Sequence, residues 1–356
     1  MKKKAWGRCI LVFFAIIFMY LFVVGGLNYV VDPLWNFRHG ISIGKFQQTF
    51  DERRQKTNWL AHHPYSKDTV LFGNSRVTIF SPEFFPGDIF NYAVGDMLPL
   101  EYGPFLRHFV ENNRGNPRSV VLGVSLRGTA GQFVNWVKTR RPAPEEYIDQ
   151  AQRASSRYAS LLDYSLFRHS LRCIGNDEAT LGAYVRLKDD FFVPTKEAPI
   201  PFAEMEKRIR IGIRANSDVF GEGYWYQSDI PDYQEMKQDF PEMDFIVFTT
   251  PVSSHVLRVL AKEGRLEDWE RWLRELVGEF GGIWHFMDYN TITSNDDYFV
   301  DTSHFSTPIA HMVVQRIYGE NEEGIPEDFG IYLHSGNIDA YLEEMKKKLQ
   351  ALSEDA

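Results

Sequence analysis

The sequence contains little cysteine. Its 356 residues include only Cys9 and Cys173, and two cysteines rule out a disulfide-stapled scaffold. The chain also lacks a basic excess, because 39 Lys and Arg stand against 48 Asp and Glu. An acidic balance argues against a nucleic-acid-binding protein, whose surface normally carries a basic face. We therefore expect no nucleic acid among its partners.

Repeats, low-complexity tracts and Asn-x-Ser/Thr glycosylation sequences are also missing, and the last absence fits a bacterial exterior. No group of His, Cys, Asp and Glu has the spacing of metal ligands. His304 and His311 stand two helical turns apart, too far for one ion. We therefore expect no metal and no other cofactor. The composition, 44% apolar and 24% charged, is that of a globular chain and excludes general disorder.

The longest uncharged run covers residues 9–31. About 20 apolar residues in a helix span the hydrocarbon core of a bilayer, whereas a signal-peptide core usually has roughly 7–15. The run therefore predicts an uncleaved transmembrane anchor, with a cleaved signal peptide as the alternative. Lys2, Lys3, Lys4 and Arg8 precede it, so the positive-inside rule places residues 1–8 in the cytoplasm and the rest of the chain outside.

The part after the anchor alternates strands and helices. Residues 32–66 are predicted to be a juxtamembrane segment with a helix at 51–62. The apolar strands at 67–73, 89–95 and 119–124, with a helix at 99–112 between the last two, predict right-handed crossovers and a parallel sheet.

This alternation of strands and helices stops at about residue 129 and resumes near residue 227. We interpret residues 129–227 as a mostly helical insertion that forms a cap or subdomain, with helices at 145–171 and 177–190 and a loop at 193–201. The later predicted elements are a helix at 232–240, a strand at 245–250, an amphipathic helix at 266–280, a last strand at 283–287 and a helix at 308–318. The tail, 321–356, carries a charged helix at 338–352. The predicted fold is a three-layer α/β/α parallel sheet over residues 67–320, preceded by one transmembrane helix.

Three polar side chains follow strands of this sheet. Ser75 comes directly after the first strand, and Asp301 and His304 lie after the last strand and before the last helix. In an open parallel sheet, ligands bind beyond the carboxyl ends of the strands. There His304 can take the proton of Ser75 while Asp301 orients the imidazole. Gly95, after the second strand, is predicted to supply a backbone N–H to an oxyanion hole.

The structural alternatives for these residues stay open. Serine is a favoured N-cap residue, so Ser75 can cap the helix that follows it. Gly95 can be present only for a turn that needs a positive φ. Trp269 and Trp272 share one face of the 266–280 helix, which predicts a place in the core. The aromatic run at residues 224–226 fits either a packed loop or a surface that faces carbohydrate.

Serine after strand one, glycine after strand two and Asp-x-x-His before the last helix resemble the SGNH (GDSL-like) hydrolase superfamily. The resemblance covers about residues 67–318 and implies that Ser75 is the nucleophile, His304 the general base, Asp301 its orienter and Gly95 an oxyanion donor. One block departs from it: Ser125 stands where the superfamily has an asparagine that donates to the oxyanion. Ser125, Arg76 or Arg127 can replace that donor.

The layout is similar to a subgroup of membrane-anchored SGNH-like proteins, which includes relatives of the D-alanyl-transfer protein of teichoic acids and of alginate O-acetylation proteins. The resemblance implies a single-pass protein of the bacterial inner membrane. It implies a serine-dependent acylesterase or O-acyltransferase acting on a cell-envelope polysaccharide, with a membrane-bound acyl-donor protein as a further partner. The alternative is a non-catalytic glycan-binding or assembly module, which the missing asparagine favours because fold does not guarantee function.

Overall fold

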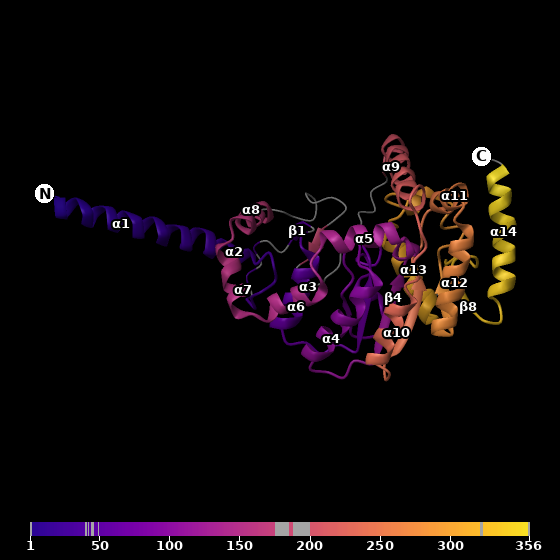
Figure 1. The fold of residues 1–356 in the computed structure, drawn as a ribbon, viewed down its shortest axis with the longest axis horizontal. Helices are drawn as coiled ribbons and strands as arrows, with labels where there is room; N and C mark the ends of the chain where they lie inside the picture. The colour runs from indigo at the N-terminus through magenta and orange to yellow at the C-terminus, as the bar shows by residue number, and fades with distance from the viewer. Residues whose placement is uncertain are drawn as a thin grey trace. The chain divides into compact units, whose positions relative to one another are not determined.

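The computed structural model describes residues 2–39, 41, 43, 46–48, 50–174, 185–187, 200–320 and 323–354 (Figure 1). The chain divides into two compact units, one formed by Met1–Pro64 with Glu145–Asp189 and the other by Tyr65–Pro144 with Asp190–Ala356. The expected insertion at 129–227 is therefore shared between the units: its middle belongs with the N-terminal segment, and its two ends belong with the sheet.

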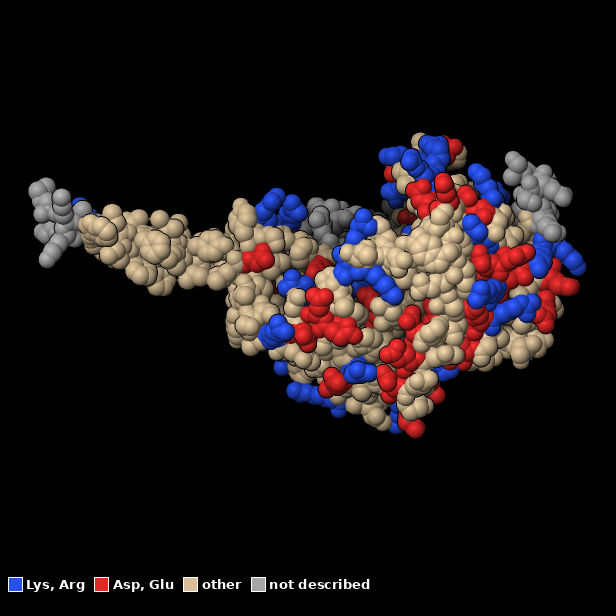
Figure 2. Space-filling view, in the orientation of Figure 1, with Lys and Arg blue, Asp and Glu red and all other residues tan. Residues whose placement is uncertain are grey.

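The first unit begins with a helix that is long and apolar enough to cross a membrane, Trp6–Val31. Length and composition alone support this, and a signal sequence near the N-terminus passes the same test. Figure 2 shows the N-terminal part of this helix almost entirely tan, whereas blue and red side chains are mixed over the rest of the visible surface. The apolar span lies within three consecutive helical elements: α1 (Lys2–Tyr20), a π-helical turn η1 (Leu21–Gly25) and α2 (Gly26–Val31).

The last turn of this helix is tied to later parts of the same unit. The Asn28 side-chain amide donates to the carbonyls of Leu161 (2.9 Å) and Asp163 (3.1 Å), and Ser170 Oγ donates to Asn28 Oδ1 (2.9 Å). The other elements of the unit are β1 (Phe46–Gln48), α3 (Glu52–His62), α6 (Pro144–Gln152), α7 (Ala154–Ala159), η5 (Ser160–Leu162), α8 (Tyr164–Cys173) and β5 (Val185–Leu187), which pairs antiparallel with β1.

The helical stretch predicted at 145–171 is confirmed as helical, but it is divided into α6, α7, η5 and α8. Asp163 accepts from the backbone N–H groups of Ser165 and Leu166 and so starts α8 as a separate helix. The helix expected at 177–190 contains the strand β5 instead. The rest of that range, and most of the loop expected at 193–201, lie outside the described residues.

The second unit is built on a six-stranded sheet in the order β3-β2-β4-β6-β7-β8. All neighbouring pairs are parallel except β7 and β8. The strands are β2 (Thr69–Gly73), β3 (Ile89–Asn91), β4 (Ser119–Val124), β6 (Asp244–Thr249), β7 (Gly282–His285) and β8 (Ile331–His334). The predicted parallel α/β sheet is thus confirmed for five strands. The expectation that the strand near 283–287 is the last one is wrong, since β8 adds an antiparallel edge.

The helices of this unit are α4 (Tyr102–Asn112), α5 (Gly131–Arg140), α9 (Phe202–Phe220), α10 (Ile230–Asp239), α11 (Ser254–Lys262), α12 (Leu266–Phe280), α13 (Thr307–Tyr318) and α14 (Ile338–Glu354). Short 3₁₀ turns stand at η2 (Pro82–Phe84), η3 (Pro99–Glu101), η4 (Leu126–Thr129) and η6 (Asp296–Tyr298). The helix α11 has no counterpart in the sequence prediction.

Helices cover both sides of the strand β2, whose successive side chains point to opposite faces. Leu71 belongs to a buried cluster with Ile309 and Val313 of α13. Phe72 stacks against Tyr92 and Tyr102 instead, on the side that α4 covers, with ring centroids 5.6 and 5.5 Å apart. A strand buried on both faces explains the continuous apolar run in its sequence.

Candidate active site

Two glycines allow the loop after β2 to pack closely against the sheet. Gly73 and Gly123 face each other in register at the ends of β2 and β4. A Cβ atom at either position would overlap the side chain of Val77, and one at Gly73 would also lie 2.8 Å from the Gly123 carbonyl. The missing side chains therefore let Val77 cover both strand ends. This contact, with a hydrogen bond from Val77 N to Asn74 O (2.8 Å), holds the turn that carries Ser75.

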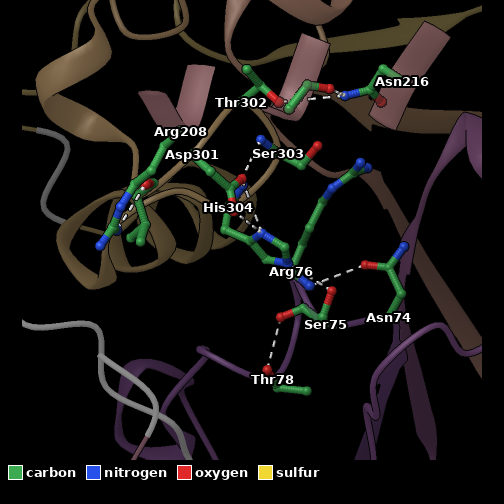
Figure 3. Close-up of polar contacts among 12 residues, drawn as sticks. Asn74, Ser75, Arg76, Thr78, Arg208, Asn216, Asp301, Thr302, Ser303 and His304 are labelled. Atoms are coloured by element: carbon green, nitrogen blue, oxygen red, sulfur yellow. Dashed lines mark hydrogen bonds and ion pairs between the residues drawn. The ribbon is translucent and has the colours of Figure 1, made fainter. Parts of the chain in front are cut away.

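Ser75, His304 and Asp301 lie together at this end of the sheet (Figure 3). Ser75 Oγ is 2.8 Å from His304 Nε2. On the other side of the ring, His304 Nδ1 is 2.9 and 3.1 Å from the two carboxylate oxygens of Asp301. A carboxylate only accepts, so Nδ1 carries the hydrogen and Nε2 faces Ser75 as an acceptor. This arrangement can accept the serine proton and stabilise the imidazolium that results.

The Asp301 carboxylate stays ionised at neutral pH. Burial works against its charge, but hydrogen bonds from His304 and from the backbone N–H groups of Ser303 (2.7 Å) and His304 (2.9 Å) outweigh it and lower the pKa of Asp301 from 3.8 to about 2. A carboxylate that accepts several backbone hydrogen bonds is held in its charged form. The same contacts fix the turn, so Asp301 orients the imidazole and also shapes the loop that carries it.

The helix α9 supports this loop from behind. Gly212 packs directly on Thr302, because a Cβ at Gly212 would overlap Thr302 Oγ1. One turn away, the Asn216 side-chain amide donates to Gly212 O (2.8 Å) and approaches Thr302 Oγ1 (3.4 Å, Figure 3). Arg208 of the same helix donates to the carbonyl of Val300 (3.2 Å). The part of the expected insertion that lies C-terminal to residue 200 thus positions the loop that carries Asp301 and His304. We refer to Ser75, His304 and Asp301 as the triad.

Arg76 and Ser125 contact each other beside the triad. Arg76 is almost fully buried, and its Nη1 donates to Ser125 Oγ (2.7 Å) and to Thr250 Oγ1 (3.2 Å). Burial, together with the nearby Arg127, lowers the pKa of Arg76 to about 9, so the guanidinium is still charged at neutral pH. Ser125 Oγ also accepts from the backbone of Arg127 (3.4 Å).

Gly95 lies after β3, and its carbonyl accepts from Arg141 Nη1 (2.8 Å). The explanation of Gly95 by a positive φ is wrong, because the residue with left-handed backbone at this turn is Asp96 (φ 48°). Asp96 is held there by an ion pair with Arg141 (2.8 Å). Asp96, rather than Gly95, lines the cavity at the triad.

This cavity has a volume of about 30 Å³ and opens beside Ser75 and His304. Its apolar wall combines side chains from three neighbouring segments: Met97, Leu98, Pro99, Tyr102 and Phe133. Its polar wall consists of Asn74, Arg76, Asp96, Ser125, Arg127 and Ser303. Sequence reasoning did not single out Asp96, Thr250 or Phe133. Asp96 lies in the turn after β3 and Thr250 directly follows β6, so strand ends were the available signal for these two residues. Phe133 lies in the helix α5, where no such signal marked it.

The remaining sequence hypotheses have mixed outcomes. Trp269 and Trp272 are buried in the core, as predicted. Trp225 is half-exposed and packs over Gly131. His311 stacks on Phe84. Within the described residues, no group of three His, Cys, Asp or Glu side chains is placed to hold a metal ion.

Comparison with models of known protein families finds no match, and neither does comparison with curated proteins.

Proposed function

We propose that this protein is a membrane-anchored, extracytoplasmic acylesterase or O-acyltransferase of the SGNH type, with the three-layer fold of that superfamily. Its substrate would be an acyl ester of a cell-envelope polysaccharide. The observation that carries the proposal is the hydrogen-bonded series from Ser75 Oγ through His304 to Asp301, with distances of 2.8 and 2.9 Å. A nucleophile, a base and an orienting carboxylate at these distances are what acyl transfer requires.

The reaction would proceed in two steps. Ser75 Oγ attacks the carbonyl carbon of the ester while His304 Nε2 takes the hydroxyl proton. The bond from this carbon to the leaving oxygen breaks, and His304 returns the proton to that oxygen. Water or a sugar hydroxyl then attacks the acyl-Ser75 ester, with His304 as base again, and restores the serine. Hydrolysis and transfer differ only in this second nucleophile.

The hydrogen-bonding of Ser125 supports its role in place of the missing asparagine. Ser125 Oγ accepts from Arg76 and from the backbone of Arg127, so its own hydroxyl hydrogen remains to be donated. Ser125 lines the cavity beside Ser75 and His304. One oxyanion donor is worth about 10²–10³ in rate in a serine protease.

The size of the cavity supports a small acyl group. A volume of about 30 Å³ accommodates roughly two water-sized groups, which suits an acetyl-type group. The apolar helix supports an anchor in the bacterial inner membrane, with the N-terminus in the cytoplasm and the site outside. Such a place brings the site to the polysaccharide and to a membrane-bound acyl donor.

The test is turnover of p-nitrophenyl acetate by the full-length protein in detergent micelles, beside Ser75→Ala and His304→Ala. We expect turnover in the intact protein, an acyl group on Ser75 detected by mass spectrometry, and loss of both in the two variants. His311→Ala is the matched control, because His311 is exposed on α13 and stacks on Phe84 away from Ser75. Turnover that survives Ser75→Ala, or an intact protein with neither turnover nor acyl-serine, would refute the proposal and favour a glycan-binding module.

A further inference from the structure

The cavity beside Ser75 carries an excess of positive charge. Its lining includes two guanidinium groups, Arg76 and Arg127, and one carboxylate, Asp96. That carboxylate already forms an ion pair with Arg141. Among the described residues, the other anion that acts on both arginines is Asp301, which is engaged by His304. The cavity thus holds more cationic groups than the anionic groups around it neutralise.

The two arginines differ in what their side chains do. Arg76 is held by two hydroxyl groups, those of Ser125 and Thr250. The Arg127 guanidinium donates to no side chain or carbonyl among the described residues, and its Nε is buried without a partner. It lies over the ring of Phe133, 4.6 Å from the centroid. This contact with the ring positions the group and leaves its N–H donors available.

A buried guanidinium nitrogen without a partner is costly, so the position of the Arg127 Nε at a cavity wall points to a ligand. A carboxylate or a phosphate matches the fork of donors on an arginine and would neutralise the excess charge. An ester carbonyl alone satisfies this site poorly, because a carbonyl is uncharged in the ground state.

We propose that Arg127 binds an anionic group, a carboxylate or a phosphate, that the substrate carries next to its ester. The inference rests on the proposed function and adds to it the charge of the substrate. Because Arg127, Ser75 and His304 line one small cavity, the anionic group lies close to the ester in the bound substrate. Two sources share this chemistry: the acyl group itself, or the sugar that carries or receives it.

The experiment measures binding rather than turnover, so it does not depend on catalysis. Full-length Ser75→Ala protein in detergent micelles is titrated by NMR with two pairs of probes. The first pair, monomethyl succinate and methyl butyrate, differs by a carboxylate on the acyl group and tests for an anion on that side of the ester. The second pair, methyl β-glucuronide and methyl β-glucoside, tests for an anion on the sugar side. Inorganic phosphate is added as a competitor in both.

We expect the charged member of one pair to bind roughly tenfold to 100-fold more tightly than its neutral partner, and phosphate to compete with it. Adding Arg127→Gln should abolish the preference, and Arg127→Lys should keep it at reduced affinity. Arg107→Gln is the control, because Arg107 pairs with Asp239 outside the cavity.

Equal binding within both pairs, or a preference that survives Arg127→Gln, would overturn the inference. Failure of the proposed function gives a different result from failure of this inference. In that case the charge preference would be present, but the wild-type protein would form no acyl-Ser75.

Discussion

Replacing Gly212 with alanine tests whether α9 sets the position of the loop that carries Asp301 and His304. The new Cβ would overlap Thr302 Oγ1 and lie 2.8 Å from Thr302 Cγ2 and 3.0 Å from Thr302 Cβ. Thr302 is buried, and its neighbours are hydrogen-bonded to Asp301, so it cannot move without moving the triad. We therefore expect the added methyl group in Gly212→Ala to displace Thr302 and, with it, the backbone that carries His304.

The expected change in the free energy of unfolding follows from two opposing effects. Overpacking a buried site costs about 1–3 kcal/mol, and replacing glycine by alanine in a helix returns about 1 kcal/mol. The free energy of unfolding should therefore fall by only about 0–2 kcal/mol. Activity is more sensitive, because a displacement of about 1 Å near reacting groups can cost about 10² in rate. We expect kcat to fall about 100-fold while the protein stays folded.

Thr302→Ala removes the two atoms that the new methyl group meets most closely, so Gly212→Ala/Thr302→Ala should regain most of the lost activity. The assay is kcat with p-nitrophenyl acetate, beside thermal unfolding of each variant. Gly278→Ala is the matched control: Gly278 lies in α12, and a methyl group there would meet no atom within 4 Å, so that change should leave kcat unaltered. Full activity in Gly212→Ala, or a double variant no better than the single one, would refute the reasoning.

Three further predictions concern Asp301, Asp229 and Trp272. Asp301→Asn should lower kcat about 10⁴-fold, as loss of the orienting carboxylate does in serine proteases. The lowered pKa of Asp301 contributes about 2 kcal/mol of stability that is present above about pH 4 and is lost as pH falls toward 2, so unfolding of this variant should depend less on pH in that window. Burial raises the pKa of Asp229 to about 7, so the wild type should lose stability as pH rises from about 4 to 7, and Asp229→Asn should flatten a plot of Tm against pH there. Trp272→Ala should lower the free energy of unfolding by about 3–5 kcal/mol, measured by thermal denaturation, since Trp272 is fully buried; little change would contradict its place in the core.

Elements with a strong local pattern could be predicted from the sequence. The strand β4 and the helix α12 have the predicted ends, 119–124 and 266–280. Both are decided by their own residues: β4 is a continuous apolar run, and the buried face of α12 repeats at helical spacing. The apolar helix at the N-terminus follows from length and composition in the same way.

Elements that depend on distant partners could not be predicted. The four residues of β8 are too few for a periodic pattern, and they form a strand because β7 offers an open edge for antiparallel pairing. The break before α8 did leave a local signal, since Asp163 is a typical N-cap residue. That signal was outweighed by the helical spacing on either side.

The candidate site was only partly foreseeable. Ser75, Asp301 and His304 could be selected because strand ends share one edge of a parallel sheet. The contact of Arg76 with Thr250 joins residues far apart in the chain and needs the register of β4 and β6. The unpartnered state of the Arg127 guanidinium is likewise a property of three-dimensional packing, and no spacing in the sequence encodes it.

The hydrogen bonds of Asn28 bear on how a shortened chain can be prepared. A chain that starts at Asp32 lacks Asn28 and leaves the carbonyls of Leu161 and Asp163 without its amide. Removing the whole apolar helix therefore removes hydrogen bonds from the interior of the first unit. Because Ser170 completes the same cluster, the unit can close only after β2, β3 and β4 have left the ribosome. Synthesis order thus delays the packing of the last turn of the apolar helix until three of the six strands of the sheet have been synthesised.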